Sequence, residues 1–192
     1  MEAELATRFL DVIEEDVVPL TEVGVASGNK IFGAAVLRRS DLSVVVAATN
    51  NETANPLWHG EIHAIKLLHE LPERPPPTDC YFVATHEPCS LCLSGIAWAG
   101  FDNVAYLFSH QDSADSFAIP HDLRILREVY AVPDPDRDAV HPERDLYNRT
   151  NAFFTSTRIP VEPGRFTRIA ARYDELSATY QTSKGGTGIP HA

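Results

Sequence analysis

The chain has 192 residues, of which 44% are hydrophobic and 22% are charged. These fractions are those of an ordinary globular protein at the upper end of the length of one domain. No stretch approaches the length of about 20 apolar residues that a membrane span needs, and the acidic start at residues 1–4 lacks the basic flank of a secretion signal. Three cysteines do not form the paired framework of a small secreted fold. We therefore expect a cytoplasmic protein without a membrane segment.

The net charge of −11 is concentrated in the first part of the chain. Residues 1–120 hold 6 basic and 17 acidic residues, whereas residues 121–192 hold 10 of each. Proteins that bind nucleic-acid polymers cluster Lys and Arg on one face, because the release of counterions from the phosphates supplies much of the affinity. Long DNA or RNA is therefore not an expected partner.

The first part of the chain predicts a helix followed by a hairpin. Apolar residues recur at helical spacing from Leu5 to Val17, and Pro19 ends this pattern. Residues 31–38 form the first predicted strand and residues 44–48 the second. The unbroken apolar run of the second strand indicates burial on both of its faces.

Helices and strands alternate after the hairpin. The predicted elements are a helix at 62–68, a strand at 80–85, a helix at 91–99, a strand at 104–108 and a helix at 123–129. Each helix has apolar residues at helical spacing, and prolines or a glycine separate the elements. An alternation of this kind is typical of an α/β sandwich.

The last part of the chain gives weaker signals. A stretch rich in proline and aspartate covers residues 133–142. Two segments beyond residue 143 have no definite pattern: each fits a helix, a strand or a segment docked on the core. They are the aromatic pair at 153–154 and the segment 166–173. We predict one domain at 1–180, with a core at 31–129 and a C-terminal extension at 130–180 whose secondary structure the sequence does not determine. A flexible tail is predicted at 181–192, where small and polar residues leave little to bury.

Four residues with metal-binding or proton-transfer chemistry lie at the starts of two predicted helices. His59 and Glu61 begin one helix, and Cys89 and Cys92 begin the next. Two thiolates and one imidazole suit Zn²⁺, whose tetrahedral shell then keeps a fourth position free for water. Side chains tilt toward the N-terminus of their helix, so both pairs can reach a metal just beyond the helix ends. Glu61 is then left over as a proton carrier.

Other interpretations of these residues stay open at this stage. The spacing of Cys89 and Cys92 after a strand is also that of a thioredoxin-like dithiol, although His59 thirty residues earlier argues against it. His63 lies four residues after His59, so the chain has the residues for a closed Cys2His2 structural site without catalysis. Trp58 adjoins a ligand and fits either the wall of a base pocket or the core.

The His-Gly-Glu motif at 59–61 and the Pro-Cys-Ser-Leu-Cys motif at 88–92 closely resemble the signature of the cytidine deaminase superfamily. The resemblance covers roughly residues 31–129. It implies a three-layer α/β/α sandwich with a central mixed sheet of about five strands. The zinc ligands that it implies, for one ion per chain, are His59, Cys89 and Cys92, and the proton carrier is Glu61.

The same resemblance implies contacts with the substrate. Asn50, at the end of the second predicted strand, matches the asparagine that hydrogen-bonds the substrate ring. The backbone amide of Gly60 is a candidate donor to the tetrahedral intermediate. The sequence around the first motif is similar to fungal cytosine deaminase, whereas residues 96–99 and 115–117 resemble bacterial guanine deaminases, in which an aspartate of the second loop reads the base. In this sequence that aspartate is Asp115, and both kinds of enzyme act on free nucleobases.

We therefore expect zinc-dependent hydrolytic deamination of a small aminated base, such as guanine or cytosine, with release of ammonia. The tRNA adenosine deaminases share the metal motif, but they handle a long polyanion, and the acidic first part of this chain argues against that substrate. A non-catalytic, zinc-stabilised interaction domain is the remaining alternative, which ammonia release would separate from an enzyme. Relatives are commonly homodimers or larger, so a homodimer is expected.

Overall fold

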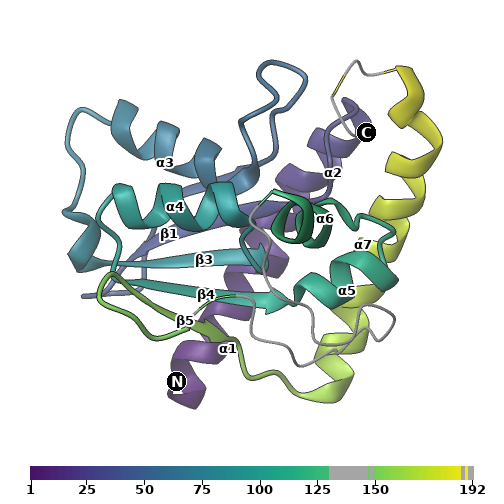
Figure 1. Cartoon of the computed structure of the whole chain (residues 1–192). Helices are drawn as coiled ribbons and strands as arrows, with labels where there is room; N and C mark the ends of the chain where they lie inside the picture. Colours follow the sequence, from purple (N-terminus) through teal and green to yellow (C-terminus); the bar gives the residue numbers. More distant parts are fainter. Residues whose placement is uncertain (130–146, 148, 187–188, 190–192) are drawn as a thin grey trace.

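A mixed sheet forms the centre of the computed structural model, which describes residues 1–129, 147, 149–186 and 189 (Figure 1). Its strands are Gly33–Arg38 (β1), Val44–Thr49 (β2), Cys80–His86 (β3), Asn103–Phe108 (β4) and Thr155–Arg158 (β5). The strand order is β2-β1-β3-β4-β5. β1 is antiparallel to β2 and β3, whereas β3 is parallel to β4 and β4 to β5.

Helices cover both faces of this sheet (Figure 1). The helices of the described residues are α1 (Ala3–Val12), η1 (Ile13–Val17, a π-helix), α2 (Val18–Ala26), α3 (Gly60–Glu70), α4 (Ser90–Trp98), α5 (His110–Asp115), α6 (His121–Glu128) and α7 (Pro163–Ser183), with 3₁₀ turns η2 (Pro77–Asp79) and η3 (Lys184–Gly186). α3 and α4 pack on one face, and α1, η1, α2 and α7 pack on the other. The predicted three-layer α/β/α sandwich is therefore confirmed. Among the described residues, no helix has the length and apolar character that a transmembrane span requires.

The alternation of side chains along the strands fills two separate cores. In β1, Ala34 and Val36 face α3 and α4, whereas Ala35 and Leu37 face α1 and α7. Neighbouring residues of a strand point to opposite faces, so a central strand with apolar residues at every position serves both layers. The sheet therefore fixes the position of the helices that carry the two sequence motifs.

The first helix continues beyond the proline at which the sequence predicted its end. A π-helical turn, η1, joins α1 to α2, and the backbone N–H of Val18 donates to the carbonyl of Ile13 five residues earlier. Pro19 then lies in the first turn of α2. A proline is tolerated there because the N–H that it lacks would have no helical partner.

The second strand is less buried than its composition predicted. β2 lies at the edge of the sheet and pairs only with β1 among the described strands. Val46 and Ala48 are buried, whereas Val44, Val45 and Ala47 are partly exposed. The expectation of burial on both faces is therefore wrong, because an apolar run alone does not distinguish an edge strand from a central one.

The C-terminal segment completes both the sheet and one helical layer. β5 adds a parallel strand beside β4, and α7 packs Tyr173 and Tyr180 into the core. The segment 166–173, which the sequence left open, is helical. The helix also extends into the predicted tail, since α7 ends at Ser183. Gln181 donates a hydrogen bond from Nε2 to the carbonyl of Phe117. The proline- and aspartate-rich stretch 133–142 and most of the tail after residue 186 lie outside the described residues.

Candidate active site

The two helices that carry the sequence motifs begin beside each other above the sheet (Figure 1). His59 is the N-cap of α3 and Cys89 is the N-cap of α4. Glu61 and Cys92 follow within the first turn of the same two helices. Partial positive charge at helix N-termini favours thiolates there, which are the form that binds metals.

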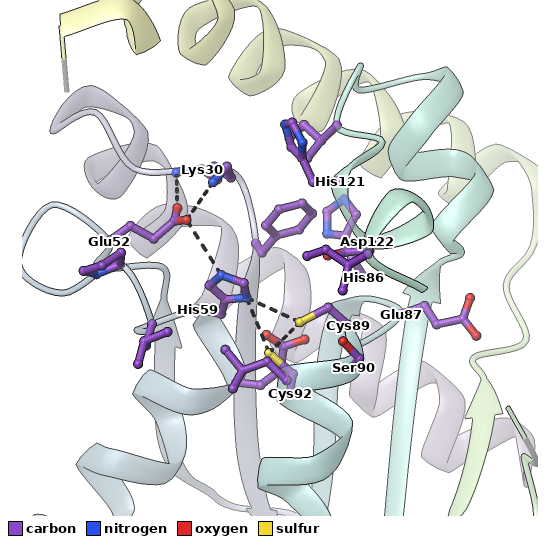
Figure 2. Close-up of a pocket in the computed structure, with 17 residues that line it drawn as sticks. Lys30, Glu52, His59, His86, Glu87, Cys89, Ser90, Cys92, His121 and Asp122 are labelled. Atoms are coloured by element: carbon purple, nitrogen blue, oxygen red, sulfur yellow. Dashed lines mark hydrogen bonds and ion pairs between the residues drawn. The ribbon is translucent and has the colours of Figure 1, made fainter. Parts of the chain in front are cut away.

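The ligand atoms of His59, Cys89 and Cys92 converge on one point (Figure 2). Nδ1 of His59 lies 3.5 Å from Sγ of Cys89 and 3.7 Å from Sγ of Cys92, and the two sulfurs are 3.5 Å apart. Zinc bonds of about 2.0–2.3 Å at tetrahedral angles place such atoms roughly 3.5–3.8 Å from one another. The three predicted ligands are therefore positioned to bind one metal ion, and their spacing fits zinc.

His63 does not supply a fourth ligand. Its Nδ1 lies 2.8 Å from the carbonyl oxygen of Thr49, and its ring stacks on Trp58. Within the described part of the chain, the three residues above are the only group whose ligand atoms converge in this way. The closed Cys2His2 interpretation is therefore wrong. The described residues supply three ligands, the number found in catalytic zinc sites, which keep a fourth position open. A simple dithiol is also excluded, because His59 lies against both sulfurs.

The protonation of the three ligand residues is linked. The hydrogen bond with Cys92 and the contact with His59 hold the pKa of Cys89 well below that of a free thiol. Burial raises the pKa of Cys92 well above that of a free thiol. Burial alone would lower the pKa of His59, but the hydrogen bond and charge of Cys89 raise it to about 9. Metal binding requires the thiolates and a neutral imidazole, so it displaces the protons that these groups carry.

Glu61 lies among the ligand residues and is not itself part of the ligand group. Its side chain is buried, and burial, followed by the negative charge of Cys89, raises the pKa of its carboxyl to about 7. A nearby cation would lower this pKa, because it favours the carboxylate. A carboxyl with a pKa near neutrality both accepts and donates protons readily, which suits general acid–base catalysis.

A cavity of about 340 Å³ opens next to the metal site (Figure 2). Its apolar wall includes Phe32, Leu57, Ile119 and Ile125, and its polar wall includes Lys30, Glu52, His121 and Asp122. Small-molecule sites have volumes of about 300–1,000 Å³, with mostly apolar linings and a few polar groups that orient the ligand. The cavity therefore has the size and lining of a site for a small, partly polar molecule.

Asn50 and Gly60, two of the predicted substrate contacts, lie next to each other behind the cavity wall. Asn50 is buried, and its Oδ1 accepts a hydrogen bond from the backbone N–H of Gly60. A Cβ on Gly60 would lie 2.6 Å from the Cα of Gly33, so a residue without a side chain lets α3 begin directly against β1. Neither residue is among those that line the cavity.

Trp58 and Asp115 also lie outside the cavity lining. The Trp58 ring packs between His63 and the ammonium of Lys66, which lies 5.0 Å from the ring centroid. Asp115 is the exposed last residue of α5, and its carboxylate accepts a hydrogen bond of 2.6 Å from Nε2 of Gln111. The structure therefore does not bring Asp115 to the place where its predicted role would be performed.

Asp122 supplies a carboxyl at the cavity wall instead (Figure 2). It lies in the first turn of α6, and burial, followed by the charge of Cys89, raises the pKa of its carboxyl to about 8. Sequence reasoning missed Asp122, although its place just before the predicted helix at 123–129 gave a weak signal. Lys30 and Glu52, which also line the cavity, belong to no motif and gave no signal.

The comparisons with known proteins agree with this geometry. Residues 17–108 match the model of the cytidine and deoxycytidylate deaminase zinc-binding region. Guanine deaminase of Bacillus subtilis (strain 168) is 31% identical over 87 residues, which are 44% of this chain and 54% of that protein. The match thus spans about half the length of this curated relative.

Two solved structures are similar over most of the chain. Guanine deaminase from Bacillus subtilis is 27% identical, with a TM-score of 0.53, and the match covers 76% of this chain and 85% of that one. Guanine deaminase from Nitrosomonas europaea is 19% identical, with a TM-score of 0.55, over 90% of this chain and 84% of that one. The second likeness concerns the fold alone.

The matched region contains both motifs, the three zinc ligands and Glu61. Residues 17–108 of this chain are therefore similar to the zinc-binding region of the cytidine and deoxycytidylate deaminases. This match agrees with the resemblance that the sequence motifs indicated, and the fold is similar to that of solved guanine deaminases.

Proposed function

We propose that this protein is a zinc-dependent hydrolase that deaminates a small aminated heterocycle, with a free nucleobase as substrate and guanine as the first to test. The observation that carries the proposal is an open three-ligand metal site with a spare buried carboxyl, Glu61, at the wall of a cavity of about 340 Å³. The similarity to bacterial guanine deaminases supports guanine over cytosine.

Glu61 is the proton carrier of the proposed reaction. Bound zinc supplies a Lewis acid that makes water a nucleophile at neutral pH. The Glu61 carboxylate would accept a proton from the attacking water and donate it to the ring nitrogen beside the amino-bearing carbon. The carboxylate would then take the proton of the hydroxyl group formed on that carbon and pass it to the amino group, so that the carbon–nitrogen bond breaks, ammonia leaves and a carbonyl group remains. The burial of Glu61 among the ligand residues keeps solvent from competing for these protons.

Asp122 is the proposed contact for the far edge of the base. Its carboxyl lies on the cavity wall, and a carboxyl oxygen accepts hydrogen bonds from the amino and imino groups of a base. The apolar walls, which include Phe32 and Ile119, suit the faces of a flat ring. Asn50 has a different proposed role: its bond to the Gly60 amide fixes the start of α3, which carries Glu61.

We propose that the protein forms a homodimer through α4. Trp98 is 91% exposed, and Leu91, seven residues earlier on the same helix, is also exposed. Large apolar side chains on one exposed helix face are typical of an interface between protein chains. The three cysteines are free thiols, which supports the expected cytoplasmic location.

A substrate panel tests the proposed activity. The zinc-loaded protein is incubated with guanine, cytosine, adenine, their nucleosides and aminated triazines, and ammonia is measured over time. We expect release from a free base, with guanine fastest. If no compound yields ammonia above the metal-free protein, the chain is a zinc-stabilised domain without this catalysis.

A further inference from the structure

An ion pair is buried directly behind the zinc-binding histidine. Nζ of Lys30 lies 2.8 Å from Oε1 of Glu52, and only 9% and 1% of their side chains are exposed. The two residues come from segments that are distant in the sequence, before β1 and after β2. In Figure 2, the Glu52 carboxylate lies between Lys30 and the ring of His59.

The Glu52 carboxylate contacts four groups at once. Oε1 faces Nζ of Lys30 and, at 3.8 Å, Nε2 of His59. Oε2 accepts hydrogen bonds from Nδ2 of Asn50, at 2.8 Å, and from the backbone N–H of Lys30, at 3.2 Å. Each oxygen therefore has a defined partner, and the carboxylate has little freedom to move.

The position of Glu52 bears on which nitrogen of His59 is available to a metal. Nδ1 of His59 faces the two cysteine sulfurs, and Nε2 faces Glu52. A neutral imidazole carries one proton, and a carboxylate beside Nε2 favours that proton there. Nδ1 then keeps a free lone pair that points at the metal position.

A second connection from Glu52 reaches the backbone beside His59. Asn50 donates from Nδ2 to Glu52 and accepts at Oδ1 from the N–H of Gly60, the residue that follows the histidine. Glu52 therefore constrains both the ring of His59 and the start of α3. Since a metal site needs its ligand atoms fixed within a few tenths of an ångström, both constraints favour binding.

Folding stability alone gives a weak reason for this ion pair. Replacing a buried ion pair by apolar residues of similar volume is often neutral or stabilising, because two charges lose their hydration on burial. Removing one partner alone is strongly destabilising, since the other charge stays buried without compensation. Lys30 thus neutralises and holds the Glu52 carboxylate. The other face of that carboxylate lies against His59, so a function of Glu52 is to be sought at that histidine.

We propose that Glu52, held by Lys30, is a positioning residue that orients His59 for zinc and thereby strengthens zinc binding. The proposal rests on the zinc site and is independent of the reaction and of the substrate. Its test measures metal affinity, so its failure is distinguishable from a failure of the proposed deamination.

Zinc affinity is measured by competition with a chromophoric chelator for the wild type, for Glu52→Gln and for the double variant Lys30→Met/Glu52→Leu. Loss of an outer partner of a metal-binding histidine weakens metal binding about 10- to 100-fold, and we expect this for both variants. Thermal unfolding of the metal-free proteins is measured in parallel. The apolar double variant is expected to unfold near the wild-type temperature and still to bind zinc weakly, a combination that a purely structural role does not give.

Lys66 and Glu70 provide a matched control. Their ion pair has a similar length, 2.7 Å, but lies on the exposed side of α3, away from the metal site. Lys66→Met/Glu70→Leu is expected to leave zinc affinity within twofold of the wild type. If Glu52→Gln is poorly folded, the apolar double variant decides. Zinc affinity within twofold of the wild type in the folded double variant would overturn the proposal.

A spectroscopic measurement addresses the tautomer of His59 directly. Long-range ¹H–¹⁵N spectra of the zinc-loaded wild type are expected to show a proton on Nε2 that exchanges slowly with solvent. In Lys30→Met/Glu52→Leu this proton should exchange faster, because its carboxylate partner is absent. Equal exchange rates in the two proteins would contradict the orientation by Glu52.

Discussion

At the scale of single residues, substitutions of Asp122 and Asp115 distinguish which of the two aspartates recognises the substrate. Asp122→Asn keeps the shape of the side chain and removes one acceptor at the cavity wall. A buried donor without its partner costs about 1–3 kcal/mol, so kcat/KM for the preferred base should fall roughly 5- to 150-fold. Steady-state kinetics at equal zinc content measure the effect.

Asp115→Asn is the matched control for that variant. Asp115 is exposed and hydrogen-bonded to Gln111, so kcat/KM of the Asp115→Asn variant should stay close to the wild-type value. A large loss in Asp115→Asn with little change in Asp122→Asn would return the recognition role to the residue that the sequence indicated.

His86 makes stability depend on pH. It is buried among the rings of Phe32, Phe108, Phe117 and Tyr173, and burial, with a smaller effect of His110, lowers its pKa to about 3. In the unfolded chain a histidine has its ordinary pKa of about 6.5. Between these two values the unfolded state binds more protons, so the free energy of unfolding falls as the pH falls, by at most about 1.4 kcal/mol per pH unit.

The variant His86→Phe should remove this contribution. Urea unfolding between pH 7 and pH 4.5 is expected to show a shallower loss of stability than in the wild type. His69→Gln, a change at an exposed histidine, should keep the wild-type slope. Identical slopes in His86→Phe and the wild type would mean that His86 is protonated in the folded protein.

The residues of the metal site were predictable from the sequence, and the residues around them were not. His59, Glu61, Cys89 and Cys92 occupy fixed positions at helix starts, so local spacing alone brings each pair to a helix end. Lys30, Glu52 and Asp122 reach the cavity only because three separate segments pack together. No local pattern encodes that packing.

At the scale of elements, local patterns misjudged boundaries where the tertiary context decides. Pro19 marks a helix end in isolation, yet a π turn places it at the start of α2, where proline is tolerated. The apolar run of β2 is typical of a central strand. Among the described strands, however, β2 pairs only with β1, and its own sequence does not indicate this edge position. These elements could therefore be predicted as helix or strand, but the end of the helix and the edge position of the strand could not.

Ion pairs join α7 to the N-terminal helices. The guanidinium of Arg165 contacts the carboxylates of Asp11, at 2.7 Å, and Glu14, at 2.5 Å. Arg165→Ala leaves these two carboxylates without their shared partner, so the free energy of unfolding should fall by about 1–2 kcal/mol. Denaturant titration measures the loss.

Arg168 supplies the comparison for Arg165. Its side chain is mostly exposed and contacts Glu14 at 3.2 Å. Arg168→Ala should therefore cost less than about 0.5 kcal/mol, as exposed ion pairs do. Equal losses in the two variants would show that the charges act over the helix surface as a whole and not through the shared contact of Arg165.

At the scale of the whole molecule, the exposed indole of Trp98 predicts assembly through α4. Trp98→Glu places a charge in the proposed interface, so the mass measured by light scattering should fall from that of a dimer to that of a monomer. Phe153→Glu, a change at another exposed aromatic residue, should leave the mass unchanged. A wild-type protein that is monomeric at micromolar concentration would refute the proposed dimer.

The α/β class followed from the alternation of helices and strands, and the resemblance to the deaminases implied the three layers, but neither located the last strand. β5 has only four residues, and its place beside β4 depends on a return of the chain after residue 149. Short strands of polar residues such as Thr155–Arg158 have no clear signal in the sequence. Its pairing with the sheet is a property of the complete fold.

The most direct test of zinc-dependent deamination compares ammonia release by the wild type and by Glu61→Gln, with zinc measured in both. Both proteins should hold about one zinc per chain, because His59, Cys89 and Cys92 are unchanged. The wild type should release ammonia from a nucleobase, and Glu61→Gln should turn over roughly 10²- to 10⁴-fold more slowly, since general acid–base catalysis is lost. A zinc-loaded wild type that releases no ammonia, or a Glu61→Gln variant within tenfold of its rate, would contradict this account.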